Sequence, residues 1–101
     1  MTKFSVYSLK KSPKTYVVDV QANVWGHFRT RVIVPLVPEE KLTTEKINRL
    51  QPIIKMDGKE YLFLAPEITV LPVKEIGKMV GDVTLFYDDI RDALDFLFQG
   101  F

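Results

Sequence analysis

Apolar and β-branched residues recur in short runs along most of the chain, and polar or glycine-containing segments separate them. Runs of this kind, whether alternating or continuous, predict strands. They cover residues 4–8, 16–21, 30–34, 53–56, 59–64 and 68–73. Because most connections between them are short, we expect antiparallel pairing.

Three segments carry signals of their own. Asp57 and Gly58 supply the positive φ angles that a two-residue turn demands, so the hairpin around them is the clearest in the chain. Residues 10–14 predict a polar turn, and Pro35 and Pro38 are expected to limit how far the third strand continues inside a sheet. Residues 39–51 fit a helix about as well as a loop or a small side sheet.

The last eighteen residues, Thr84 to Phe101, predict one amphipathic helix. Asp82 and Thr84 are candidate caps, and Gly77 and Gly81 punctuate a short segment before it. The apolar positions are Phe86, Ile90, Ala93, Leu94 and Leu97, and the polar positions on another face are Asp88, Asp92, Asp95 and Gln99. No Lys or Arg occupies the last turn, where the helix dipole favours positive charge. An external partner explains the later carboxylates better than helix stability does, and a solvated face is the alternative.

This order of elements predicts an α+β fold. A single helix must cover the sheet to complete a two-layer core, which requires a strongly bent antiparallel sheet or partial barrel. A chain of 101 residues is close to the commonest domain size, so we expect a single domain over residues 1–101.

The composition is that of a soluble globular protein, with 47% hydrophobic and 27% charged residues. No apolar run approaches the roughly 20 residues that a membrane-spanning helix needs. The N-terminal segment lacks a continuous apolar signal, and the chain has no cysteine. We therefore expect a cytoplasmic protein without disulfides or thiolate metal ligands.

The charges are unevenly distributed, although the net charge is only +1. Residues 1–81 carry thirteen Lys or Arg and eight Asp or Glu, a balance of +5, whereas residues 82–101 carry one Arg and five Asp, a balance of −4. A basic partner is therefore expected for the C-terminal element. The small net charge argues against nonspecific binding to nucleic acid.

Candidate catalytic groups are few. His27 is the one histidine, which excludes a multi-histidine metal site. We expect it to be a surface loop residue, and the alternative is an acid–base role near Asp19, Arg29 or Arg31. The aspartates of the predicted helix point outward in a fan and do not converge, whereas calcium needs about six or more oxygens. No metal and no cofactor is expected.

Several short motifs occur in order over nearly the whole chain. They are F-S-V-Y at Phe4 to Tyr7, V-D-V-Q at Val18 to Gln21, T-R-V-I-V-P-L at Thr30 to Leu36, V-L-P-V at Val70 to Val73, I-G at Ile76 and Gly77, and I-R-D-A-L-D-F-L-F-Q-G-F at the end. In order, spacing and total length they resemble the CcdB family, the toxins of toxin–antitoxin modules that poison DNA gyrase. The last motif resembles that family's I-x-x-A-[IL]-x-[FL] helix and terminal Gly-hydrophobic pair.

The resemblance implies a non-enzymatic homodimer with a five-stranded antiparallel sheet, a smaller side sheet and one long C-terminal helix. Members of this family insert paired C-terminal helices into the A subunit of DNA gyrase and trap the enzyme on cleaved DNA. A CcdA-type antitoxin binds the toxin through a flexible segment and removes it from gyrase. By position, the implied gyrase-binding residues are Gln99, Gly100, Phe101, Asp95, Asp92, Asp88, Val24 and Trp25.

Gln99 departs from the family pattern. The best-studied members carry tryptophan there, a large flat anchor of the kind that often dominates interface energy. We expect Trp25 and Phe101 to replace this anchor in part. Two other functions stay open: a ribonuclease, because the CcdB fold resembles that of the RNA-cleaving toxins MazF and Kid, and an inactive family member that acts as an antitoxin decoy.

Overall fold

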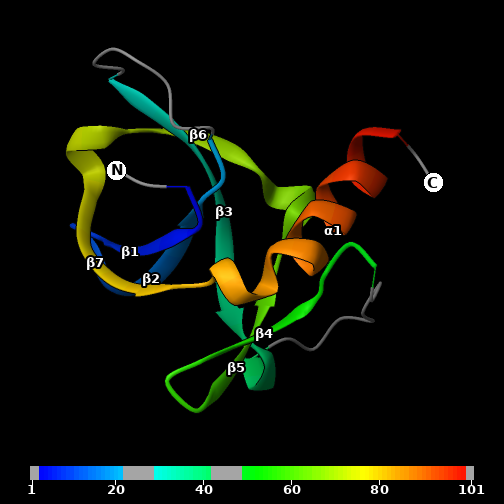
Figure 1. The fold of residues 1–101 in the computed structure, drawn as a ribbon. Helices are drawn as coiled ribbons and strands as arrows, with labels where there is room; N and C mark the ends of the chain where they lie inside the picture. Colours follow the sequence, from blue (N-terminus) through cyan, green and yellow to red (C-terminus); the bar gives the residue numbers. More distant parts are fainter. Residues whose placement is uncertain (1–2, 22–28, 42–48, 100–101) are drawn as a thin grey trace.

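The computed structural model describes residues 3–21, 29–41 and 49–99. Within these ranges the chain forms seven strands, four short 3-10 helices and one α-helix (Figure 1). The strands are β1 (Ser5–Leu9), β2 (Ser12–Asp19), β3 (Thr30–Pro38), β4 (Ile53–Met56), β5 (Lys59–Phe63), β6 (Thr69–Pro72) and β7 (Ile76–Asp82). The helices are η1 (Glu39–Lys41), η2 (Ala65–Glu67), η3 (Val73–Glu75), η4 (Thr84–Phe86) and α1 (Tyr87–Gln99).

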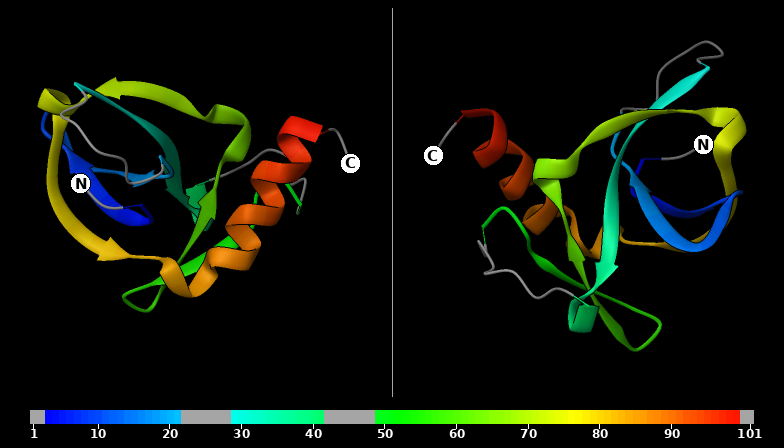
Figure 2. Two further views of the ribbon diagram at one scale, coloured as in Figure 1. Left: turned by 45° about the horizontal axis from the view of Figure 1, so that its top comes forward. Right: turned by 180° about the vertical axis from the view of Figure 1, so that it is seen from behind.

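All strand pairs are antiparallel, and the strands join in the order β4-β5-β3-β2-β1-β7, with β6 also paired to β3. The sheet curls so that β1, β2, β3, β6 and β7 surround a common interior, and α1 lies outside this ring (Figure 1). Two further views show the same arrangement (Figure 2). The predicted α+β fold, with a strongly bent antiparallel sheet and one C-terminal helix, is confirmed.

The sheet divides at β3. Residues 30–33 pair with β6, whereas residues 36–38 pair with β5. The β4–β5 hairpin therefore extends the sheet away from the ring as a small side sheet (Figure 1). None of the helices in the described part of the chain combines the length and the apolar character needed to cross a membrane.

Alternation along the strands builds two apolar clusters on opposite faces of the sheet. Neighbouring residues of a strand point to opposite sides. The first cluster includes Val6, Val18 and Val34 together with Ile90 and Ala93 of the helix. The second is made by Tyr7, Val17, Ile33 and Ile76. The first cluster therefore fills the space between sheet and helix, and the second fills the interior of the ring.

Two turns test the predicted connections. Asp57 and Gly58 have φ angles of 53° and 77° and join β4 to β5, so the predicted two-residue hairpin is confirmed. The turn before β2 consists of Lys10 and Lys11 alone, and the strand begins at Ser12. The polar turn predicted over residues 10–14 is therefore too long.

Of the two prolines expected to limit β3, Pro38 is its last residue, as predicted, whereas the strand continues through Pro35. The Pro35 carbonyl accepts a hydrogen bond from the Leu64 N–H at 3.1 Å, so its backbone polar groups face the side where β3 changes partner from β6 to β5. Pro35 has no N–H to donate. It lies between the residues that pair with β6 and those that pair with β5, where a proline is tolerated. Of the undecided stretch after it, Glu39–Lys41 forms η1, and residues 42–48 lie outside the described residues.

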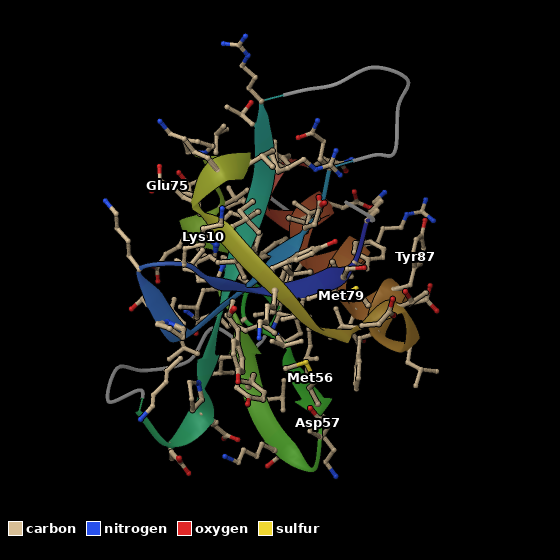
Figure 3. The ribbon with its side chains drawn as sticks, turned by 90° about the vertical axis from the view of Figure 1, so that its left-hand side faces the viewer. Lys10, Met56, Asp57, Glu75, Met79 and Tyr87 are labelled. Atoms are coloured by element: carbon tan, nitrogen blue, oxygen red, sulfur yellow. The ribbon has the colours of Figure 1, made fainter. Side chains whose placement is uncertain are left out.

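The short segment that Gly77 and Gly81 punctuate, which was not predicted to be a strand, forms β7. It pairs with β1 through two register shifts. A Cβ at Gly81 would overlap the Met56 sulfur, and one at Gly77 would lie 3.0 Å from the Ser8 carbonyl oxygen. Figure 3 shows Met56 near the end of β7. At both positions the absence of a side chain therefore allows another residue, Ser8 or Met56, to lie close to β7.

Candidate functional site

A turn at the end of β7 leads through η4 into the C-terminal helix α1. Asp82 Oδ1 accepts a hydrogen bond from the Thr84 backbone N–H at 2.8 Å. Bonds from the Thr84 side chain, the larger cause, and from its backbone lower the pKa of Asp82 below its ordinary value. Val83 occupies the N-cap position of η4 and makes no side-chain cap hydrogen bond, so neither predicted cap residue is the N-cap; Asp82 instead holds Thr84, the first residue of η4. Asp88 and Asp89 follow in the first turn of α1, where the helix dipole favours negative charge.

Phe4 joins the sheet to the start of α1. Its N–H donates to the Asp19 carbonyl at 2.6 Å, and its own carbonyl accepts from the Val83 N–H at 2.9 Å. Its φ of 68° lies in the left-handed region, which bulky residues rarely adopt without such support. The buried ring meets Tyr87 edge to face, with ring centroids 5.4 Å apart. These contacts fix the first turn of α1 against the sheet.

The polar side of α1 faces solvent. Ile90 and Ala93 are fully buried, so they mark the side that packs on the sheet. At about 100° per residue, the polar positions fall within an arc of about 60° on the opposite side. They are Asp88, Asp92, Asp95 and Gln99, and all four are exposed. We call this set the acidic stripe.

Arg49 reaches the acidic stripe from outside the helix. Its Nε and Nη2 each donate to one carboxylate oxygen of Asp92 at 3.3 Å. Its guanidinium also lies over the Phe96 ring, 4.5 Å from the centroid. Arg49 is not among the site residues that the sequence predicts. No local signal pointed to it, because Arg49 and Asp92 are 43 positions apart.

A second arginine and a shallow cavity border the other edge of the stripe. Arg91 lies one helical turn before Asp95, and their charged groups are 3.8 Å apart. The cavity, of about 260 Å³, lies between α1 and the ends of β1 and β2, and Lys3, Tyr87, Arg91 and Asp95 are among its lining residues. The two borders of the stripe therefore each carry one arginine.

Large apolar side chains are exposed near the stripe. Phe98 precedes Gln99 and exposes 71% of its surface, and Leu85 in η4 is almost fully exposed at 97%. Exposed aromatic residues of this size are typical of interface anchors. The end of α1 thus combines carboxylates with an exposed aromatic ring.

A buried ion pair joins the two strand ends that flank residues 22–28. Arg31 Nη2 lies 2.7 Å from Asp19 Oδ2, and both side chains are buried. Gln21 completes the network: its N–H donates to Asp19 Oδ1, its carbonyl accepts from Arg31, and its side-chain oxygen accepts from the Val32 N–H. The network holds the ends of β2 and β3 together.

The remaining predicted site residues lie outside the described part of the chain. They are Val24, Trp25, His27, Gly100 and Phe101. Of the residues considered for acid–base chemistry, Asp19 and Arg31 are committed to the buried ion pair, and Arg29 is exposed at the start of β3. Among the described residues, no group of three or more His, Asp or Glu is arranged to hold a metal ion.

The fold and this helix define a class of α+β protein in which a curled antiparallel sheet presents an exposed C-terminal helix. The sequence profile described as CcdB protein matches residues 3–100, which is nearly the whole chain. The chain belongs to the CcdB family. Membership places it among the toxins of toxin–antitoxin modules and implies an antitoxin partner.

A solved structure described as "Endoribonuclease from Mycobacterial species" has the same fold. The TM-score is 0.77, the sequence identity is 21%, and the match covers 98% of this chain and 91% of that chain. At this identity, the likeness concerns the fold alone.

Proposed function

We propose that this protein is a toxin that binds the A subunit of DNA gyrase through α1 and traps the complex of gyrase with cleaved DNA. A CcdA-type antitoxin neutralises it. The proposal combines membership of the CcdB family with the presence of an exposed acidic stripe on the last helix. No enzymatic step by this chain is required, because gyrase itself cleaves the DNA.

The observation that carries the proposal is the orientation of α1. A helix that only completed the core would need apolar residues on its buried side, where Ile90 and Ala93 lie, and nothing particular on its other side. Here the other side gathers three carboxylates and Gln99; the dipole favours Asp88 in the first turn, but Asp92 and Asp95 lie beyond it and no basic residue occupies the last turn. An exposed row of carboxylates, although Arg49 and Arg91 border it, favours a basic protein partner.

The other contact residues complete the proposed surface. Val24 and Trp25, in the segment after β2, and Gly100 and Phe101, after α1, are assigned to it by their positions in the family motif. Gln99 lacks the flat apolar surface of tryptophan, so Trp25 and Phe101 are proposed to share the role of anchor. We expect W25A and F101A each to weaken binding of a gyrase A fragment in calorimetry, by about tenfold or more. Affinities equal to that of the parent would contradict this assignment.

A homodimer in the cytoplasm, where gyrase and the antitoxin are found, is part of the proposal. Large apolar side chains lie exposed in the described part of the chain, and a second copy would cover some of them. They are Ile53, Val70, Met79, Leu85, Tyr87 and Phe98. Light scattering of the purified protein tests this state, and a monomer at the concentrations used for gyrase binding would contradict it.

RNA cleavage is the second candidate, favoured by the likeness to an endoribonuclease structure. That chemistry requires a base and a cationic stabiliser in one accessible cleft. Asp19 and Arg31 are buried in an ion pair, which argues against them as such a pair. An inactive antitoxin decoy is the third candidate, because Gln99 replaces the usual anchor.

One experiment separates the three functions. The protein is induced in cells with wild-type gyrase and in cells with a resistant A subunit, and growth and total RNA integrity are measured together. Growth arrest that requires sensitive gyrase, with intact RNA, is the expected result. Degraded RNA in both strains would instead support the ribonuclease, and normal growth in both would support the decoy.

A further inference from the structure

The contact between Arg49 and α1 has the geometry of a guanidinium-binding site. Asp92 accepts two hydrogen bonds from the Arg49 guanidinium, one on each oxygen, at 3.3 Å. The Phe96 ring supports the same guanidinium from one face, at 4.5 Å from its centroid. A carboxylate that binds bidentately and an aromatic face are the two features that proteins use to recognise arginine in preference to lysine.

The Arg49 side chain can leave this site without unfolding the chain. Both charged groups of the pair are about half exposed, so the contact is of the weak, solvent-screened kind. The backbone next to Arg49 is held separately, because the Leu50 carbonyl accepts a hydrogen bond from the Ala65 N–H at 3.3 Å. The hydrogen bonds to Asp92 and the contact with Phe96 are all made by the Arg49 side chain. Exchange of one guanidinium for another therefore needs only a side-chain rotation.

We propose that Asp92 and Phe96 form a guanidinium-binding site, which the chain's own Arg49 fills in the free protein and an arginine of the basic partner takes on binding. Arg49 is then an internal competitor that weakens the association and selects for partners with a correctly placed arginine. The site is in the acidic stripe, so the gyrase part of this proposal rests on the proposed function. The existence of the guanidinium-binding site does not depend on that function.

Arg91, which is part of α1, offers a matched comparison with Arg49. It also faces a stripe carboxylate, Asp95, but through a single contact of 3.8 Å and without a described ring beneath its guanidinium. Both arginines are largely exposed, and replacing either one by alanine changes the net charge equally. A difference between R49A and R91A therefore reports on the site and not on overall charge.

The first measurement uses N-acetyl-arginine amide as a probe and follows the Phe96 ring signals by NMR. We expect R49A to bind the probe about three- to fivefold more tightly than the parent and R91A do, because the internal competitor is gone. N-acetyl-lysine amide should perturb the ring much less, since it lacks a planar guanidinium. Adding D92N to R49A should abolish this gain in affinity for the arginine probe, because the carboxylate that binds the guanidinium is gone. R49Q serves as a second variant if R49A loses the signal dispersion of a folded protein.

The second measurement is calorimetry with a gyrase A fragment. R49A is expected to bind about three- to fivefold more tightly than the parent, and R91A within about twofold of it. Equal behaviour of R49A and R91A with both the probe and gyrase would overturn the inference while leaving the proposed function intact. If the probe results hold and no variant binds gyrase, the proposed function fails and the guanidinium site stands.

Discussion

Asp82 lies where β7 ends and the helical segment begins, and its carboxylate accepts both bonds from Thr84. These bonds lower the pKa of Asp82 relative to its unfolded value of about 3.9. A lowered folded-state pKa means that the stabilisation is fully present above the unfolded value. It is lost as the pH falls through the lower, folded value.

D82A is therefore expected to lower the free energy of unfolding by about 0.5–1 kcal/mol at pH 7, because it removes the hydrogen bonds that the carboxylate accepts from Thr84 at the start of η4. D82N keeps a hydrogen-bond acceptor and should cost less. Urea denaturation between pH 7 and pH 2.5 measures both variants. The difference between parent and D82N should shrink below pH 4. A difference that stays constant over this range would show that the carboxylate charge has no part in this stabilisation.

Gly81 is a second residue whose effect is local and measurable. Its missing side chain leaves room for the Met56 sulfur under β7. G81A is expected to destabilise the fold by about 1–3 kcal/mol, because the added methyl group overpacks the core. In the M56A background the same change should cost clearly less, since the obstructing sulfur is absent. Equal costs in both backgrounds, measured by urea denaturation, would contradict the packing explanation.

At the level of elements, the Asp19–Arg31 ion pair joins the end of β2 to the start of β3. R31M leaves the Asp19 carboxylate buried without its cation, which typically costs about 3–5 kcal/mol. We expect D19L/R31M to be more stable than R31M alone, because the double variant removes the unpaired charge as well. Thermal and urea unfolding measure both. A double variant less stable than R31M would indicate that the hydrogen bond that the Asp19 carboxylate accepts from the Gln21 N–H matters more than charge pairing.

The elements of this protein differ in how well the sequence predicts them. The helix was predictable because its apolar spacing is regular, and the β4–β5 hairpin because Asp57-Gly58 specifies its turn. β7 was missed because Gly77 and Gly81 read locally as breaks, and only the contacts with Ser8 and Met56 explain them as strand residues.

The same distinction applies to the candidate site. The periodicity of the helix alone predicts that the acidic stripe shares one face, since local spacing determines which helical residues lie together. The contact of Arg49 with Asp92 and Phe96 depends on how the chain returns to α1 after 43 positions. Such long-range contacts have no local signal, which is why the sequence missed the residue that faces the stripe.

At the scale of the whole molecule, charge and shape act together. The curled sheet forms two apolar clusters, and α1 uses only one side to cover the first of them. Its other side is left exposed at the negative end of a chain whose remaining residues are net positive. The central claim is that this exposed acidic side binds gyrase, and it predicts a position-specific loss of affinity.

The most direct test compares two triple variants with the same change in net charge. D88N/D92N/D95N removes the carboxylates of the stripe, whereas E60Q/E67Q/D89N removes three exposed carboxylates outside it. Calorimetry with a gyrase A fragment should show the stripe variant binding about ten- to a hundredfold more weakly than the parent, and the control variant within about twofold of it. Equal affinities of the two triple variants would contradict the account.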